Sequence, residues 1–170
     1  MNDTATQVLS EAALVKLDRE IAKYPSDQKQ SAVMAALAIA QDEHGWLSPA
    51  TMDFVAHYLG MPPVAVYEVA TFYAMYNQEP VGKYKITICT NLPCALQGAT
   101  VAAEHLKAKL GVGFGETTAD GLVTLKEGEC FGACGDAPVL LVNNKRMCSF
   151  MRAEKIDALL DELRASGGAP

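Results

Sequence analysis

The sequence predicts an α+β chain in which a small helical bundle, residues 1–80, is followed by a compact α/β domain, residues 81–170. Three observations predict this order. Apolar residues recur at helical spacing as far as Tyr73, a polar stretch with Pro80 and Gly82 follows, and the chain beyond it has the patterns of strands. The length of 170 residues suits one ordinary domain or two small ones. With 50% apolar and 20% charged residues, the chain is not disordered.

Four short helices are expected in the first domain. Ser10 and Ser26 are suited to cap the first two, and Ser48 caps a third that has proline at its first helical position. Gly60 ends that helix, and Pro62-Pro63 begins the fourth. Aromatic side chains in this domain fill its core or, as a second interpretation, form part of a surface that meets a partner. They are Trp46, Tyr58, Phe72, Tyr73 and Tyr76.

The second domain is expected to contain four strands and two helices. Residues 83–89 alternate polar and apolar side chains, as a half-buried strand does, and 97–110 form a helix. Shorter strands follow at 122–125, 139–142 and 146–150, the last two joined by a hairpin turn at Asn143-Asn144. A final helix carries Ile156, Leu159 and Leu163 on one face. The order strand, helix, three strands, helix predicts an α/β layer of about thioredoxin size.

Charge and hydropathy exclude several classes of function. The longest apolar run has nine residues, Ala32 to Ala40, where about 18 are needed to span a bilayer, so no direct membrane insertion is expected. The first residues lack the pattern of a secretory signal, which predicts a reducing compartment such as the cytoplasm. A net charge of −6 argues against a nucleic-acid partner. In a reducing compartment the five cysteines are expected to be metal ligands or redox groups.

Four of the five cysteines form two pairs in the second domain. Cys89 and Cys94 have four residues between them, Cys130 and Cys134 have three, and 35 residues separate the pairs. Cys89 ends the first predicted strand, and Cys94 follows in a loop that Pro93 is expected to stiffen. Cys130 and Cys134 lie in a second loop just ahead of the strand at 139–142, so the two loops are able to meet at one edge of the domain. Four thiolates in two pairs suit a [2Fe-2S] cluster, with one pair on each iron. Glycines around the second pair allow backbone N–H groups to approach the sulfurs: Gly128, Gly132 and Gly135.

Two other interpretations of these cysteines stay open on spacing alone. Four cysteines also bind structural zinc, although zinc pairs are usually closer in sequence, and a third possibility is four unconnected structural thiols. A thioredoxin-like dithiol is excluded because Cys-x-x-Cys does not occur, and a plant-type ferredoxin because Gln97 stands where its third cysteine is needed. Cys148 has no partner at ligand spacing and is expected to be buried. No dinucleotide-binding fingerprint or P-loop is present.

Nearly the whole chain resembles the E-type family, the small [2Fe-2S] subunits in the NADH dehydrogenase module of NADH:quinone oxidoreductase, respiratory complex I. The most specific marks are Cys89-Thr90-Asn91-Leu92-Pro93-Cys94, the 35-residue gap and Glu129-Cys130-Phe131-Gly132-Ala133-Cys134, followed by Ala137-Pro138-Val139. Residues 115–121 and Ala70-Thr71-Phe72-Tyr73 match as well. The resemblance implies an N-terminal helical bundle joined to a thioredoxin-like [2Fe-2S] ferredoxin domain.

The resemblance also implies a function. One [2Fe-2S] cluster on Cys89, Cys94, Cys130 and Cys134 would exchange single electrons with FMN on a partner subunit that binds NADH. The chain would then be a subunit of an oxidoreductase with no NADH site or complete active site of its own. It would contact the flavin subunit and other iron–sulfur subunits of the NADH dehydrogenase module, in the cytoplasm and peripheral to the inner membrane. Alternatives are the equivalent subunit of an NAD-dependent formate dehydrogenase or NAD-reducing hydrogenase, and a zinc-stapled interaction module.

Overall fold

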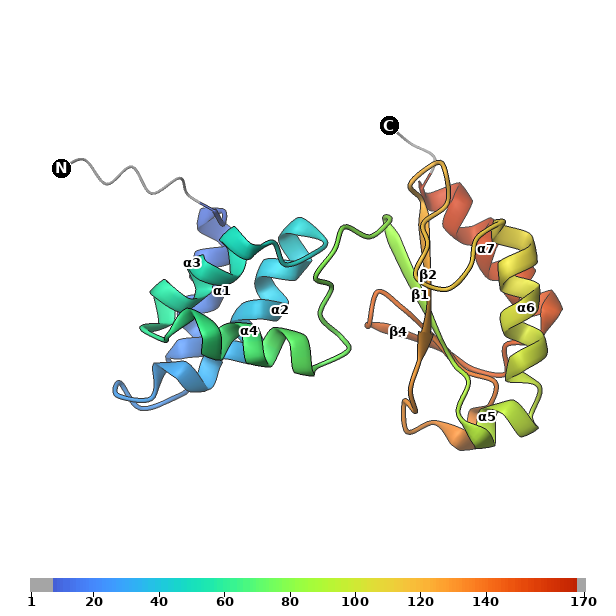
Figure 1. The fold of residues 1–170 in the computed structure, drawn as a ribbon, viewed down its shortest axis with the longest axis horizontal. Helices are drawn as coiled ribbons and strands as arrows, with labels where there is room; N and C mark the ends of the chain where they lie inside the picture. Colours follow the sequence, from blue (N-terminus) through green and yellow to red (C-terminus); the bar gives the residue numbers. More distant parts are fainter. Residues whose placement is uncertain (1–7, 168–170) are drawn as a thin grey trace. The chain divides into compact units, whose positions relative to one another are not determined.

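A computed structural model describes residues 8–167 of the chain. The chain divides into two compact units, with the boundary between Pro80 and Val81. The first unit is helical and the second contains a mixed four-stranded sheet (Figure 1). Throughout residues 8–167, each helix is either too short or too polar to cross a bilayer.

The first unit consists of α1 (Glu11–Ile21), the 3-10 helix η1 (Lys29–Ala32), α2 (Val33–His44), α3 (Pro49–Leu59) and α4 (Pro63–Phe72). The predicted caps of α1 and α3 are confirmed: Ser10 Oγ accepts a hydrogen bond from Ala13 N (3.2 Å) and Ser48 Oγ from Thr51 N (3.1 Å). The predicted cap at Ser26 is wrong. Residues 26–31 are all polar, so an α-helix there would have no apolar face to bury, and α2 begins only at Val33.

The core of the first unit is formed by apolar side chains from all its helices. Its predicted aromatic residues are divided between core and surface. Tyr76 is buried and its hydroxyl donates to the Met34 carbonyl oxygen (2.8 Å), whereas Phe72 is 78% exposed. Trp46 and Tyr58 are half-buried. The core interpretation is therefore confirmed for Tyr76, and contact of the exposed Phe72 with a partner stays a prediction.

The sheet of the second unit has the order β2-β1-β3-β4. The strand β1 (Tyr84–Cys89) lies parallel to β2 (Val123–Gly128) and antiparallel to β3 (Leu140–Val142), which pairs with β4 (Arg146–Cys148). The helices α6 (Ala99–Leu110) and α7 (Ala153–Gly167) cover one face of this sheet (Figure 1). Asn143 and Asn144 have φ values of 52° and 57°, so the predicted hairpin turn is confirmed.

Three elements differ from the expectation. A short helix, α5 (Leu92–Leu96), precedes α6 and includes a segment that was expected to be a loop. Gly98 has a φ of 94°, which separates α5 from α6 and delays the predicted start of that helix from Gln97 to Ala99. The strand β2 runs on to Gly128 because its polar end pairs with β1.

Candidate metal centre

The two cysteine loops leave the sheet at the same edge. Cys89 is the last residue of β1 and lies opposite Gly128, the last residue of the parallel strand β2. The backbone N–H of Cys89 donates to the Val139 carbonyl oxygen (3.1 Å), which fixes the first loop to the segment before β3. Because β1 and β2 are parallel neighbours, the chain after each strand enters the same region. The parallel pairing of β1 and β2 therefore explains why the two loops lie at the same edge of the sheet.

The first pair of cysteines is buried. Cys89 and Cys94 are each 1% exposed, and both pack into a small apolar cluster with Ala99, Ala137 and Val139. Cys94 lies on the inner face of α5, where Pro93 occupies the first turn of the helix instead of stiffening a loop. Burial first, and then a hydrogen bond to the Cys89 sulfur, raise the pKa of the Cys94 thiol to about 11.

The second pair is exposed to solvent. The sulfurs of Cys130 and Cys134 lie 3.7 Å apart. Gly132, with a φ of 76°, turns the loop between them so that its N–H donates to the Cys130 sulfur (3.3 Å). The hydrogen bond to Cys130 raises the pKa of Cys134, and the second cause is the charge on Cys130. Three glycines are predicted to bring N–H groups close to these sulfurs. Among the hydrogen bonds of the described residues, Gly132 is the one of the three that donates to a sulfur.

The two pairs lie close enough to influence each other. The charge on Cys134 contributes to the raised pKa of Cys94, and the charge on Cys89 to that of Cys134. Within residues 8–167, no three His, Cys, Asp or Glu side chains are gathered tightly enough to hold a single metal ion. Four thiol sulfurs arranged as two separate pairs fit a binuclear [2Fe-2S] cluster, because each of its irons takes two thiolates. They fit a mononuclear four-cysteine zinc site less well.

Gly128 allows the second loop to approach the sheet closely. A methyl group at this position would lie 2.5 Å from Thr87 Cγ2 and 2.8 Å from Phe131 Cζ, distances that real Cβ atoms do not show. Phe131 thus lies against the backbone of Gly128 and brings the loop of Cys130 back over the end of β1 and β2. A larger residue at position 128 would push this loop outward.

Two hydrogen bonds between side chains join the segment after Cys89 to the end of β2 and to the second cysteine loop. Thr90 Oγ1 donates to Glu127 Oε1 (2.7 Å), and Asn91 Nδ2 donates to Glu129 Oε2 (2.9 Å). No motif in the sequence points to any of these four residues for this role. The sequence indicates them only by their position beside the cysteines: Thr90 and Asn91 directly follow Cys89, and Glu129 directly precedes Cys130.

Cys148 packs in a different apolar cluster from Cys89 and Cys94. It is buried on β4, as predicted, and burial is the main cause of its raised pKa. Two of the three histidines have contacts outside this centre: His44 Nε2 lies 2.7 Å from the Val8 carbonyl oxygen, and His105 Nε2 lies 2.8 Å from Asp157 Oδ1.

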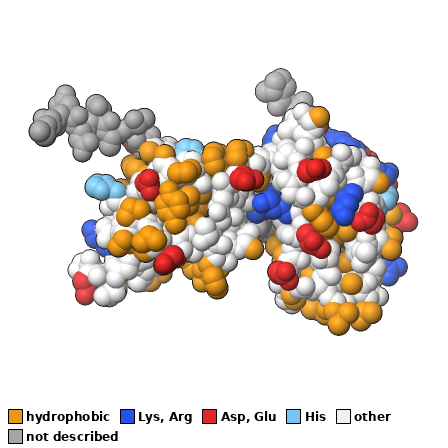
Figure 2. All heavy atoms as spheres, viewed as in Figure 1, with side chains coloured by type: hydrophobic (Ala, Val, Ile, Leu, Met, Phe, Trp, Pro, Cys, Tyr) orange, Lys and Arg blue, Asp and Glu red, His pale blue; other side chains and the backbone are white. Residues whose placement is uncertain are grey.

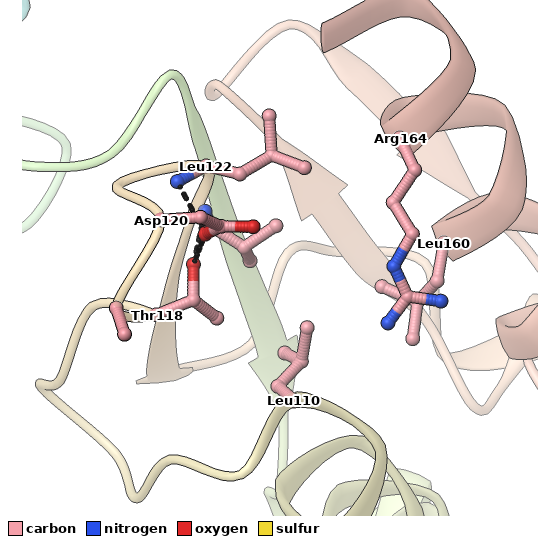
Figure 3. Close-up of a pocket in the computed structure, with 8 residues that line it drawn as sticks. Leu110, Thr118, Asp120, Leu122, Leu160 and Arg164 are labelled. Carbon is pink, nitrogen blue, oxygen red and sulfur yellow. Dashed lines mark hydrogen bonds between the residues drawn. The ribbon is translucent and has the colours of Figure 1, made fainter. Parts of the chain in front are cut away.

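A cavity of about 270 Å³ opens at the other end of β2 (Figure 3). The Asp120 carboxylate on one side of it accepts hydrogen bonds from the Thr118 hydroxyl and the Leu122 N–H, and Arg164 extends toward it from α7. No cysteine lines this cavity, so it is separate from the candidate metal centre.

Apolar side chains are exposed beside the buried pair. Leu92 and Leu96, one helical turn apart on α5, are 71% and 77% exposed, and Val101 on α6 is 75% exposed. Figure 2 shows hydrophobic side chains gathered at the end of the second unit where α5 lies. Leu92 and Leu96 flank Cys94 in sequence but point away from it, since Cys94 is buried.

Comparisons with known proteins show the family of the chain. The family model of the thioredoxin-like [2Fe-2S] ferredoxins matches residues 17–164. The chain is 42% identical to an E-type NADH-quinone oxidoreductase subunit of Rhizobium meliloti, over 89% of the chain and 88% of the relative. It is 41% identical to the mitochondrial NADH dehydrogenase [ubiquinone] flavoprotein 2 of Dictyostelium discoideum, over 89% of the chain but only 61% of that longer protein.

A solved structure shares the fold. The NAD+-reducing [NiFe]-hydrogenase in its air-oxidized state contains a region with a TM-score of 0.67 and 25% sequence identity. That match covers 79% of the chain and 23% of the hydrogenase chain. The predicted fold class, helices followed by a thioredoxin-like ferredoxin domain, is confirmed. The chain belongs to the thioredoxin-like [2Fe-2S] ferredoxin family, in the group that includes the E-type subunits of NADH-quinone oxidoreductase.

Proposed function

We propose that this chain is the small electron-transfer subunit of an NADH:quinone oxidoreductase and that it holds one [2Fe-2S] cluster on Cys89, Cys94, Cys130 and Cys134. The observation that carries the proposal is the arrangement of these cysteines in two pairs, on two loops that leave neighbouring parallel strands at one edge of the sheet. Residues 81–170 would be the cluster domain and residues 1–80 a helical domain beside it in the sequence.

Each part of the chain has a distinct task in this proposal. Cys89 and Cys94 would hold one iron, and their apolar neighbours would exclude water from it. Cys130 and Cys134 would hold the other iron, and the N–H of Gly132 would partly offset the negative charge on the Cys130 sulfur. The cluster would supply reversible one-electron transfer. The protein controls its position, its exposure to solvent and the hydrogen bonds to its sulfurs.

The partner in this proposal is the flavin- and NADH-binding subunit of the same complex, together with other iron–sulfur subunits of the NADH dehydrogenase module. Exposed apolar surface beside a functional site is typical of a protein interface, and Leu92 and Leu96 supply such surface on α5. NADH and FMN belong to the partner, which agrees with a sequence that has no dinucleotide fingerprint. Assembly with these subunits would place the chain in the cytoplasm, peripheral to the inner membrane.

The related complexes are weaker candidates. The relatives named as NADH-quinone oxidoreductase subunits have 38–43% identity, whereas the hydrogenase chain has 25% and is mostly unmatched. The match also covers 82–88% of three of these bacterial relatives, so they are similar in length to this chain. The higher identity and the similar length favour the quinone oxidoreductase.

The test is metal analysis of the full chain purified without oxygen. We expect about two irons and two acid-labile sulfides per chain, with visible absorbance and an EPR signal after reduction. Replacing Cys94 or Cys130 by alanine should abolish the stable cluster. Cys148→Ala is the matched control, because Cys148 is a buried cysteine of the same unit outside the two loops, and it should leave the EPR signal unchanged.

One zinc per chain without visible absorbance would reject the proposal in favour of a zinc-stapled module. Loss of the EPR signal in Cys148→Ala, with retention in Cys94→Ala, would reject the ligand assignment. Co-purification with flavin-containing quinone reductase subunits, instead of hydrogenase or formate dehydrogenase subunits, would identify the assembly.

A further inference from the structure

We propose that Thr90, Asn91, Glu127 and Glu129 are positioning residues that lock the two cysteine loops together, and that the charge of the two glutamates also disfavours reduction of the cluster. This inference rests on the proposed ligand set. The four residues make two hydrogen bonds across the end of β1 and β2: Thr90 donates to Glu127, near the end of β2 (2.7 Å), and Asn91 donates to Glu129, in the second loop (2.9 Å). We call this pair of hydrogen bonds the loop clamp.

The loop clamp begins where the backbone pairing of β1 and β2 ends. The last backbone hydrogen bond between the two segments runs from Thr90 N to the Gly128 carbonyl oxygen and is long, 3.4 Å. Bonds of this length are weak. The clamp therefore reinforces the last part of the sheet through Glu127, and through Glu129 it holds the two segments together beyond the end of the sheet.

Asn91 is used against its usual local preference. It stands at the N-cap position of α5 with extended backbone angles (φ −61°, ψ 157°), where an asparagine side chain ordinarily accepts a hydrogen bond from the first turn of the helix. Its side chain makes no such bond and donates to Glu129 instead. The Asn91 side chain makes the bond to Glu129 in place of the usual cap, which indicates that the contact with Glu129 is its role.

The positions of these residues connect the clamp to the cysteine pairs. Thr90 and Asn91 follow Cys89 by one and two residues, and Glu129 is adjacent to Cys130. A shift of one loop against the other would change the separation of the two pairs, which a binuclear cluster needs to be constant. The clamp is thus placed to fix that separation before iron arrives, which lowers the ordering cost of binding.

The same glutamates add two negative charges beside the cluster. Adding an electron makes the cluster more negative, so nearby carboxylates oppose reduction. Both glutamate side chains are exposed, so solvent screens their charges and weakens their opposition to reduction. The geometric role depends on hydrogen-bond donors and acceptors, and the electrostatic role on charge, so substitutions can separate the two.

The experiment uses two double variants of the cluster-loaded full chain. Thr90→Val with Asn91→Leu removes both donors and keeps the charges. We expect the cluster to be lost to an iron chelator about thirtyfold faster, which corresponds to about 2 kcal/mol for the two hydrogen bonds together. After removal of iron, amide hydrogen exchange of residues 129–134 should also be faster than in the native chain. Thr90→Ser, which keeps the hydroxyl, should behave like the native chain.

Glu127→Gln with Glu129→Gln keeps both acceptors and removes the charges. Cluster retention should be unchanged, while the ratio of reduced to oxidised cluster at a fixed potential should rise about threefold, as expected for two exposed charges. That ratio corresponds to about 28 mV for a one-electron couple. Glu154→Gln, an exposed carboxylate on α7, is the matched control and should change neither quantity.

The outcomes are distinguishable. If Thr90→Val with Asn91→Leu loses iron and exchanges amides at the native rates, the clamp has no positioning role. If the double glutamine variant has the native potential, the electrostatic part is wrong. If instead the native chain holds no iron, or Cys94→Ala retains the cluster, the proposed function itself fails and not merely this inference.

Discussion

Replacing Gly128 by alanine tests whether the close approach of the second cysteine loop is needed for stability. The new methyl group would meet Thr87 Cγ2 at 2.5 Å and Phe131 Cζ at 2.8 Å, so one of these side chains has to move. Such overpacking costs about 1–3 kcal/mol, and the loss of glycine flexibility in the unfolded chain returns about 0.4–1 kcal/mol. We expect a net loss of about 1–2 kcal/mol in the free energy of unfolding of the second unit.

Urea unfolding of the full chain measures this loss. A decrease of that size lowers the midpoint by about 0.5–1 M. The visible absorbance of the cluster and amide exchange of β1 and β2 report on the second unit. Fluorescence of Trp46, the one tryptophan of the sequence, reports on the first unit and should not change. The alanine variant should also lose its cluster faster, because Phe131 is displaced beside Cys130.

Two further variants make the reasoning refutable. Gly135→Ala is the matched control in the same loop: a methyl group there meets nothing within 4 Å, so stability should stay the same or rise slightly. Thr87→Ser removes the methyl group responsible for the shortest contact and should recover part of the loss when combined with Gly128→Ala. A Gly128→Ala chain as stable as the native one, or a double variant without any recovery, would refute the steric account.

Three other changes should have defined effects. Gly60→Ala places a side chain at a φ of 68° with no neighbour within 4 Å, so strain alone should lower the stability of the first unit by about 1 kcal/mol, as followed by Trp46 fluorescence. Burial raises the pKa of Tyr76 to about 12, so the folded first unit disfavours the tyrosinate and should lose stability as the pH rises from about 10 to about 12. Tyr76→Phe should reduce this alkaline loss without removing it, because the pKa values of Tyr58 and Tyr67 are raised as well, and an unchanged pH profile would contradict the prediction. Hydrogen bonds from Lys109 first and from His105 second lower the pKa of Asp157, so its contribution should be present above about pH 4 and disappear as the pH falls below it. Urea midpoints of the second unit between about pH 2 and 6 check this, and Asp157→Asn should show a shallower acid dependence than the native chain.

Much of the fold could be predicted because its signals are local. Ser48, the proline after it and Gly60 specify both ends of α3 through backbone angles and hydrogen bonds within a few residues. Asn143 and Asn144 specify the hairpin between β3 and β4 because both tolerate a positive φ. Such features need no knowledge of the rest of the chain.

Other elements depend on contacts between distant residues. The helix α5 has five residues, too few to show a helical period, and its proline was interpreted as a loop feature. The polar end of β2, Lys126 to Gly128, is a strand only because β1 lies beside it. The sequence pattern ended the strand at Leu125, where its apolar residues end.

The candidate site was predictable in its residue types but not in its arrangement. Spacing and chemistry singled out the four cysteines of the two loops, and the structure gathers them as two pairs. Spacing does not reveal which pair is buried, nor that Asn91 bonds to the far loop instead of capping its own helix. Both depend on tertiary packing at the end of the sheet.

One cysteine pair is exposed and the other is buried, so we expect the proposed cluster to be assembled from the exposed side. An iron–sulfur donor protein can touch Cys130 and Cys134 from solvent, but Cys89 and Cys94 lie behind the apolar cluster beneath α5. We expect delivery to begin at the open pair and to be completed when the closed pair engages. Loss of the cluster to a chelator would also begin at Cys130 and Cys134, because the chelator meets the exposed pair first, and repair would begin there too. If the four cysteines hold the proposed cluster, the path by which it is filled is set by which two sulfurs the packing leaves outside.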